Sequence, residues 1–478
     1  MASLARSIAQ NTIIHLIGRV ISIAMALVVV AIMTRALGPI GFGGYSTIIA
    51  FLQFFGIIVD FGLTLTANRM LGATINQEDT NRLMSNMMTL RFVSAVVFLG
   101  IAPCVALLFP YPTAVKEGMF LTTFSFLAII MGQTLVPVFQ KELRMMYPTI
   151  AELAGRVALL AGVGLAAYFH AGFLWFMIAI VIGSAVQYIF LSSFVKKFIR
   201  LTWAFDWNLW RKIIIVSWPI GLSILFNLVY LKADTIFLSV MRPQAEVGFY
   251  GASYRVIDQF TALATMFINL VLPPLTAAWI TKDQTRFRTL FQGAFDAYAI
   301  LALPLLAGAL FLGPRLMELI ASRAFTVSGT ILGIHMIAMV FVFFSTLFGH
   351  VIVVIEKQRS MIWGYAINAA IGLLLYALLI PRYGMFGAAW ATVATEIVIT
   401  LLTYCVAYRT TKIVPHLSVL LKSVLAAGIM GIFLYALRGT NLAILMIGSM
   451  LIYGVALYAL GGIKKETVRE ILSMRPLP

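Results

Sequence analysis

Charged residues are scarce in this sequence. Asp, Glu, Lys and Arg make up 11% of its 478 residues, whereas about a quarter is usual for a soluble domain. Acidic residues are the scarcer kind, with 17 Asp and Glu against 34 Lys and Arg. The basic residues lie mostly in short segments between long apolar runs, so the excess of positive charge does not indicate nucleic-acid binding. The composition excludes a water-soluble fold.

Cysteine is almost absent, with only Cys104 and Cys405 in the chain. The topology predicted below places the two near opposite faces of a membrane, so we expect no disulfide between them. The sequence has no pattern of His, Cys and acidic residues with metal-ligand spacing. We therefore expect neither a metal site nor a cofactor.

Apolar residues are abundant: 62% of the chain is hydrophobic and the mean hydropathy is +1.00. Continuous apolar runs of about twenty residues recur along the whole length, and each is long enough to cross a bilayer as a helix. Continuous runs, in place of alternating ones, exclude a β-barrel. We predict an all-α polytopic membrane protein with about 14 transmembrane helices. The predicted spans are residues 13–34, 44–66, 88–109, 119–139, 150–169, 172–195, 213–240, 249–275, 289–311, 329–355, 361–380, 386–408, 418–437 and 442–462.

The basic residues are distributed unequally between the two sides of the predicted spans. Of the 34 Lys and Arg, 23 lie in segments and flanks on the side of the N-terminus, 7 lie on the other side, and four lie inside spans. Arg91 is counted among the 23. Because cytoplasmic loops carry an excess of Lys and Arg, we predict a protein of the inner (plasma) membrane with both termini in the cytoplasm.

Short motifs recur across the midpoint of the chain. Gly43-Gly44-Tyr45 is echoed by Gly248-Phe249-Tyr250, and the sequence LLFP at 107–110 is echoed by FLGP at 311–314. Common order and similar offsets are the signature of an internal repeat, which is frequent in transporters. We predict an N-terminal six-helix lobe at 1–200, a C-terminal six-helix lobe at 201–412, and two additional helices with a cytoplasmic tail at 413–478.

The segment between the two predicted lobes is rich in tryptophan and in positive charge. Trp203, Trp207 and Trp210 are interleaved with Lys and Arg residues. Headgroup layers select this combination of amphipathic side chains. We therefore interpret the segment as an anchor at the membrane interface.

Several motifs, in this order and spacing, carry a resemblance to a known family. The segments are Arg35-Ala-Leu-Gly38, Gly43-Gly44-Tyr45, Asp60-Phe61-Gly62-Leu63, Lys232-Ala-Asp234-Thr-Ile-Phe, Val247-Gly248-Phe-Tyr250, Tyr254-Arg255 and GMFGAA at 384–389. Together they resemble the polysaccharide-exporting flippases, the O-antigen translocase group of the multidrug, oligosaccharidyl-lipid and polysaccharide exporter superfamily. The resemblance covers essentially the whole chain.

The resemblance implies two lobes around a central cavity that opens alternately to the two sides of the membrane. The substrate would be an undecaprenyl-diphosphate-linked oligosaccharide, moved from the cytoplasmic to the periplasmic leaflet for surface polysaccharide biosynthesis. Such a protein is a transporter and not an enzyme. Protons or sodium would drive it, and a polysaccharide polymerase and chain-length proteins would be its partners.

Basic residues inside the spans are the candidate ligands for such a substrate. A charge in hydrocarbon costs several kcal/mol, so it is by default a functional hypothesis. A lipid diphosphate is negatively charged, and guanidinium and ammonium groups bind phosphate oxygens well. We predict that Arg19, Lys232 and Arg255 bind the headgroup.

Acidic residues inside the spans are the candidate ion-coupling groups: Asp60, Asp234, Asp258, Asp296 and Glu396. A coupling carboxylate must change its protonation or its bound ion during transport. The alternative is a structural role. Arg255 and Asp258, three residues apart on one helix face, can simply neutralise each other.

Two other functions compete with lipid-linked sugar export. A multidrug antiporter of the same superfamily would favour an acidic, aromatic cavity, whereas this chain has Arg and Lys in its first, seventh and eighth spans. An O-antigen polymerase or ligase would need clustered acid and base groups on a sizeable outer loop, and no such cluster is visible.

Overall fold

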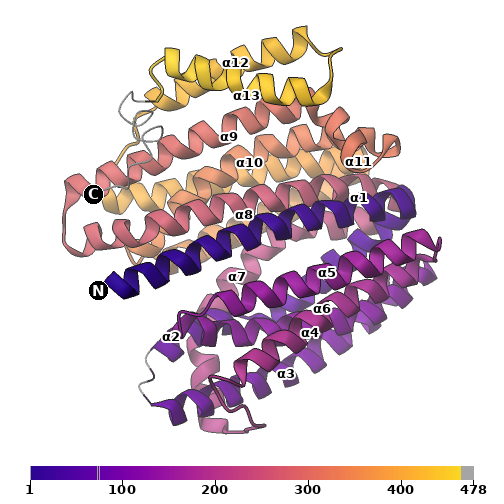
Figure 1. Ribbon diagram of the computed structural model, residues 1–478, viewed down its shortest axis with the longest axis vertical. Coiled ribbons are helices and arrows are strands. Elements are labelled where there is room, and N and C mark those ends of the chain that lie inside the picture. Colours follow the sequence, from indigo (N-terminus) through magenta and orange to yellow (C-terminus); the bar gives the residue numbers. More distant parts are fainter. Residues whose placement is uncertain (1, 73, 75, 464–478) are drawn as a thin grey trace. The chain divides into compact units, whose positions relative to one another are not determined.

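The computed structural model describes residues 2–72, 74 and 76–463, and within these ranges the chain is built of helices without a β-strand (Figure 1). The polytopic all-α architecture is therefore confirmed. The elements are α1 (Ala2–Asp60), α2 (Leu63–Gly72), α3 (Gln77–Ala106), α4 (Thr113–Lys141), α5 (Met146–Tyr168), α6 (Phe173–Val195), α7 (Trp207–Met241), α8 (Gln244–Ile280), α9 (Gln284–Ile320), the 3₁₀ turn η1 (Arg323–Phe325), α10 (Thr326–Val354), α11 (Gln358–Thr411), α12 (Ser418–Ala436) and α13 (Leu442–Ala459).

Among the described residues, eleven helices are long and apolar enough to span a membrane, or twelve if a bent pair within α7 is one span. Two helices are far longer than one crossing requires. At 1.5 Å per residue, the 59 residues of α1 and the 54 of α11 have a summed helical length of roughly 80–90 Å each, against about 30 Å of hydrocarbon. Each of the two covers a pair of the predicted spans, which accounts for the difference from about fourteen.

Both long helices are broken at a glycine. Gly38 in α1 has φ 62° and ψ −176°, and Pro39 follows it. A residue with a Cβ is strained at such a positive φ, whereas glycine adopts it freely. Proline has no N–H to leave unpaired and its fixed φ suits the first turn of the next helical segment. The Gly38-Pro39 pair thus separates the two segments of α1.

The break in α11 at Gly384, where φ is 57°, is stabilised by a carboxylate. Glu246 accepts a hydrogen bond of 3.0 Å from the backbone N–H of Met385, the residue that begins the next segment. Arg242 donates to the same carboxylate at 2.8 Å. A Cβ at position 384 would collide with Glu246. A negative group at a helix N-terminus is favourable, so the pair fixes the point where the second segment of α11 starts.

The chain forms two compact units, and their limits differ from the predicted lobes. The first unit contains residues 1–252, 320–322 and 365–388, and the second contains 253–319, 323–364 and 389–478. The division at residues 200 and 412 stays a prediction. In the first unit α4 and α5 pack on α6, α3 packs on α4, and α1 packs on α5 and α7.

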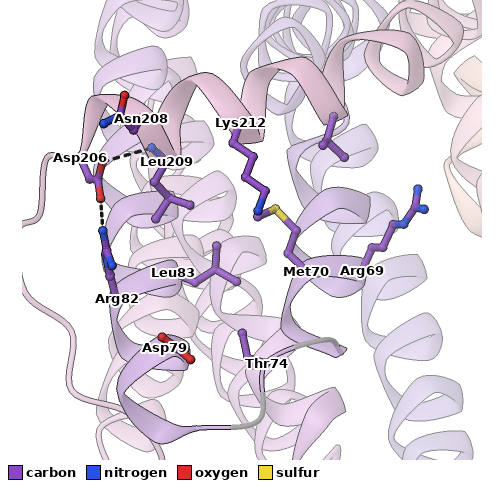
Figure 2. Close-up of a pocket in the computed structure, with 11 residues that line it drawn as sticks. Arg69, Met70, Thr74, Asp79, Arg82, Leu83, Asp206, Asn208, Leu209 and Lys212 are labelled. Atoms are coloured by element: carbon purple, nitrogen blue, oxygen red, sulfur yellow. Dashed lines mark hydrogen bonds and ion pairs between the residues drawn. The ribbon is translucent and has the colours of Figure 1, made fainter.

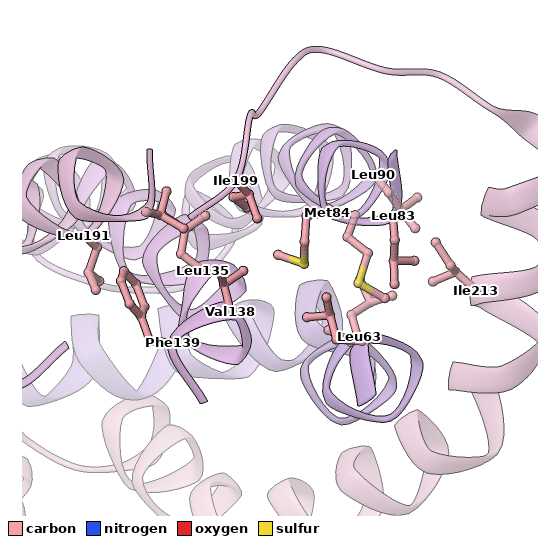
Figure 3. Close-up of a cluster of buried hydrophobic side chains, with 14 of the residues drawn as sticks. Leu63, Leu83, Met84, Leu90, Leu135, Val138, Phe139, Leu191, Ile199 and Ile213 are labelled. Atoms are coloured by element: carbon pink, nitrogen blue, oxygen red, sulfur yellow. The ribbon is translucent and has the colours of Figure 1, made fainter. Parts of the chain in front are cut away.

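A buried hydrophobic cluster lies within the first unit (Figure 3). Side chains from α2, α3, α4, α6 and the start of α7 meet there, including Leu63, Met84, Leu135 and Phe139. Trp210 belongs to this cluster and is 5% exposed, so its ring packs against the core and is not available to contact lipid headgroups. Trp203 and Trp207 are 71% and 65% exposed, as an interfacial anchor requires.

The repeated glycine motifs contact each other within the first unit. A Cβ on Gly43 would collide with the backbone oxygen of Gln244, and a Cβ on Gly248 would collide with the backbone oxygen of Pro39. The two contacts are equivalent, because Gln244 and Gly248 stand 205 residues after Pro39 and Gly43. Reciprocal contacts of this kind are what a two-fold relation between repeats produces. The sequence repeat therefore corresponds to a close, symmetric helix crossing that only glycine permits.

In the second unit, α12 and α13 pack against each other and cover α9 (Figure 1). Leu303, Ala307 and Leu312 of α9 join side chains of the two C-terminal helices in one buried cluster. The Tyr453 hydroxyl donates a hydrogen bond of 2.9 Å to the backbone oxygen of Ile300. The two additional helices thus pack as a hairpin on α9.

Candidate functional site

The predicted phosphate ligands lie on three different helices. Lys232 on α7 and Arg255 on α8 are both half-buried, and the side chain of Arg19 on α1 lies outside the described residues. Arg255 and Asp258 form an ion pair at 3.9 Å, with side chains 23% and 38% exposed. This contact agrees with the structural alternative for the pair, but partial exposure leaves the Arg255 guanidinium accessible.

Asp60 has a partner that the sequence analysis missed. The guanidinium of Arg91, which is 1% exposed, donates hydrogen bonds to Asp60 and to Thr64, and to Thr134 on α4 at 3.2 Å. The Thr64 hydroxyl donates to Asp60 at 2.5 Å. Counting Arg91 among the loop flanks was therefore wrong: it lies inside α3, fully buried. The sequence feature that indicates this burial is an arginine followed directly by a long apolar run.

Asp234 is completely buried in the first unit. It accepts a hydrogen bond of 2.6 Å from the Tyr250 hydroxyl and bonds from the backbone N–H and hydroxyl of Thr235 at 2.5 and 3.1 Å. Hydrogen bonds to a charged acceptor are worth more than those between neutral groups. Asp234 therefore lies in a rigid polar network that joins α7 to the start of α8.

The two remaining acidic candidates are in the second unit and differ from each other. Asp296 on α9 is half-buried and accepts a hydrogen bond of 2.8 Å from Gln292. Glu396 on α11 is 2% exposed. Within the described part of the chain its carboxyl group has no recorded hydrogen bond or ion pair. In the same ranges, no three His, Cys, Asp or Glu side chains are grouped so as to hold a metal ion.

A charged pocket of about 690 Å³ lies among three helix ends of the first unit (Figure 2). It is formed by the end of α2, the start of α3 and the start of α7. Its lining residues are Arg69, Met70, Thr74, Asp79, Arg82, Leu83, Asp206, Asn208, Leu209, Lys212 and Val216. This pocket is not evident from the sequence, because its charged residues come from segments more than a hundred residues apart.

The segment between α6 and α7 is bound to α3 along one edge of this pocket. Four alternate backbone N–H groups of the segment donate to side-chain oxygens of α3. The pairs are Arg200 with Asn81 at 3.1 Å, Thr202 with Ser85 at 3.1 Å, Ala204 with Thr89 at 3.2 Å and Asp206 with Asn86 at 2.8 Å. Backbone donors outside a helix need such partners. The polar residues at the start of α3 therefore hold an otherwise unsupported segment in place.

Comparison with known protein families identifies the chain. Residues 8–280 match the model of a family described as polysaccharide biosynthesis proteins. The chain belongs to this family. Membership of the polysaccharide biosynthesis family confirms the resemblance drawn from the short motifs, and the matched residues run from within α1 to the end of α8.

Two family relatives and one solved structure extend this result. The chain is 22% identical to a probable flippase, AglR, of Haloferax volcanii over 80% of each protein. It is 24% identical to a putative O-antigen transporter of Shigella dysenteriae, over 78% of this chain and 93% of that one. Its fold is similar to that of the lipid II flippase MurJ in an inward closed conformation, with a TM-score of 0.79, 15% identity, and coverage of 97% of this chain and 100% of that one.

Proposed function

We propose that this member of the polysaccharide biosynthesis family is a flippase for a lipid-linked oligosaccharide. It moves an undecaprenyl-diphosphate-linked sugar from the cytoplasmic to the periplasmic leaflet of the inner membrane by alternating access, with both termini in the cytoplasm. The family match over residues 8–280 carries the proposal. The names of the two relatives, a flippase and an O-antigen transporter, support it.

Basic side chains within the helices support the assignment of the substrate. Lys232 and Arg255 are only half-buried, so both can reach an incoming anionic group. We propose that Arg19, Lys232 and Arg255 are each ligands of the diphosphate. Positive groups within a membrane protein favour a phosphate-bearing substrate and disfavour organic cations.

Among the acidic candidates, Glu396 fits proton coupling best. Asp60 pairs with Arg91, and Asp258 pairs with Arg255. Asp234 accepts a hydrogen bond from Tyr250, and Asp296 accepts one from Gln292. Glu396 is buried without a recorded partner in the described ranges, and an unpaired buried carboxylate is costly unless it takes up a proton. We propose that Glu396 binds and releases a proton during transport, with the other four carboxyls in structural roles.

The proposed function is tested by deleting the gene in its host and measuring on which leaflet the undecaprenyl-linked sugar accumulates. Accumulation on the cytoplasmic face with loss of surface glycan supports a flippase. Arg19→Ala and Arg255→Ala should restore export poorly although both variants insert into the membrane. The control is Arg156→Ala, at an arginine of α5 that pairs with Glu152 at 3.9 Å and to which we assign a structural role; it should restore export fully. Normal glycan export in the deletion strain would refute the proposal.

The competing functions predict different results in the same strain. A multidrug antiporter would extrude cationic dyes, and the deletion would raise dye accumulation while leaving surface glycan intact. A polymerase or ligase would leave single, unpolymerised or untransferred units on the periplasmic leaflet. We expect no unpolymerised or untransferred units on the periplasmic leaflet, because translocation precedes polymerisation and ligation. We also expect no rise in dye accumulation, because basic residues within the helices disfavour organic cations.

A further inference from the structure

The pocket among α2, α3 and α7 has the size and preorganisation of a ligand site. Its volume of about 690 Å³ falls in the range of roughly 300–1,000 Å³ typical of small-molecule pockets. It is formed entirely by residues of the first unit. It lies at the helix ends that the charge pattern predicts to face the cytoplasm.

Two of its three cations are available to a ligand. The Arg82 guanidinium is bound to Asp206 at 2.5 Å (Figure 2). Arg69 in the last turn of α2 and Lys212 near the start of α7 are both exposed. Neither has a recorded hydrogen bond or ion pair in the part of the chain that the structure describes. Two cations of one pocket that form no ion pair in these ranges favour an anionic ligand.

The walls around these cations are held by other contacts. Asp206 caps α7 by accepting from the Leu209 N–H at 3.1 Å, and its own N–H is bound by Asn86. Thr74, which lines the pocket, is fixed by Lys141 through its hydroxyl at 2.8 Å and its backbone oxygen at 3.3 Å. Leu83 belongs to the buried cluster beneath. A ligand therefore meets a pocket whose shape is already formed, which lowers the entropic cost of binding.

The remaining polar groups define the ligand further. Asp79 and Asn208 line the same pocket and provide acceptors and donors for hydroxyl groups. A ligand with a phosphate for Arg69 and Lys212 and hydroxyls for Asp79 and Asn208 is a sugar phosphate ester. Arginine and lysine are common phosphate binders, whereas Asp79 would disfavour a ligand that is only anionic.

We propose that this pocket is a docking site for the sugar phosphate part of the lipid-linked substrate before translocation. The proposal rests on the flippase function and adds a binding step at the predicted cytoplasmic face. Arg69 and Lys212 bind the phosphate, and Asp79 and Asn208 bind the sugar.

Binding is measured by calorimetry with the full-length protein in phosphatidylcholine nanodiscs, using glucose 1-phosphate as the probe. The double variant Arg69→Gln/Lys212→Gln should bind at least tenfold more weakly, because the neutral amides cannot form the charge-assisted hydrogen bonds that the two cations donate to the phosphate. The control is Arg211→Gln, an exposed cation on α7 that does not line the pocket; it should bind like the wild type. Absence of binding to the wild type, or equal affinity in all three proteins, overturns the proposal.

A second arm distinguishes the sources of the phosphate ester. Polyprenyl-phosphoryl glucose placed in the nanodisc should displace glucose 1-phosphate from the wild-type protein, whereas phosphatidylglycerol at the same density should not. Displacement by neither lipid would mean that the pocket takes a soluble sugar phosphate, and equal displacement by both would mean an ordinary lipid headgroup site. Either result overturns the docking role.

Failure of the docking site and failure of the flippase function are separable. Proteoliposomes that flip a lipid-linked sugar equally well with the wild type and with Arg69→Gln/Lys212→Gln would refute the docking role and leave the flippase intact. Wild-type proteoliposomes without flipping would refute the function, whatever the pocket binds. With both proposals correct, the double variant should flip more slowly at low substrate and approach the wild-type rate at saturation.

Discussion

Two carboxyl groups that the sequence places in membrane spans, Asp60 and Glu396, have opposite surroundings. Asp60 in the first unit receives hydrogen bonds from Arg91 and Thr64. Glu396 in the second unit is 2% exposed, and no bond to its carboxyl is recorded in the described ranges. A charge away from water is stable only with a partner, whereas a carboxyl without one is stable when neutral. Asp60 therefore carries a fixed charge, whereas Glu396 can exchange a proton.

The largest effect on stability is expected from Arg91→Met. Removing one partner of a buried ion pair leaves the other charge uncompensated, which typically costs about 3–5 kcal/mol. We expect a large fall in the thermal midpoint of the detergent-solubilised protein and poor accumulation in the membrane.

The double variant Asp60→Asn/Arg91→Met is the control for this prediction. It removes both charges, so it should recover most of the lost stability, since replacing both partners of a buried pair is often nearly neutral. If the double variant is as unstable as Arg91→Met alone, the ion pair does not explain the loss.

A smaller loss is expected from Tyr250→Phe. This change removes the hydroxyl that donates to the buried Asp234 and keeps the ring. A hydrogen bond to a charged group contributes about 1.5–3 kcal/mol, and the bonds from Thr235 remain. Chemical denaturation of the purified variant measures the loss. Wild-type stability would show that the Tyr250 hydroxyl is not needed to satisfy Asp234.

The spans and their helical character could be predicted from the sequence, because about twenty apolar residues leave the backbone few alternatives in lipid. The repeat was also visible, since Gly43 and Gly248 stand in equivalent motifs. What the motifs did not indicate is that these glycines contact each other. Contacts of this kind depend on how helices cross, which hydropathy does not encode.

The candidate site was less predictable, for a physical reason. Intramembrane charges are conspicuous in sequence, but their pairing is not. Arg91 looked like a loop-flanking cation and proved to be the buried partner of Asp60. The pocket around Lys212 combines residues from three helix ends, and each of its charges looks like an ordinary cytoplasmic residue. The roles of Arg19, Lys232 and Arg255 stay predictions.

The exposed pair of Arg82 and Asp206 should contribute less to the free energy of unfolding than the Arg91–Asp60 ion pair or the Tyr250–Asp234 hydrogen bond. The hydrogen bond from Arg82, with a further one from the Leu209 N–H, lowers the pKa of Asp206. A lowered pKa in the folded state stabilises the protein above the unfolded value of about 4. This contribution is lost as the pH falls through the lowered pKa. Thermal midpoints of Asp206→Asn should therefore approach those of the wild type in acid and fall slightly below them at pH 7. A difference that persists unchanged below pH 3 would contradict this account.

The smallest change in stability is expected from Glu396→Gln, although its effect on transport should be large. If the carboxyl is already neutral in the resting protein, an amide of the same shape replaces it at a cost below about 1 kcal/mol. Gln cannot release a proton, so uptake of a lipid-linked sugar into proteoliposomes should lose its dependence on an imposed pH gradient. Glu396→Asp is the matched control, because it keeps a titratable group and should retain part of that dependence. A loss of stability like that of Arg91→Met would mean that Glu396 is an ionised, paired group, and the contrast with Asp60 would not hold.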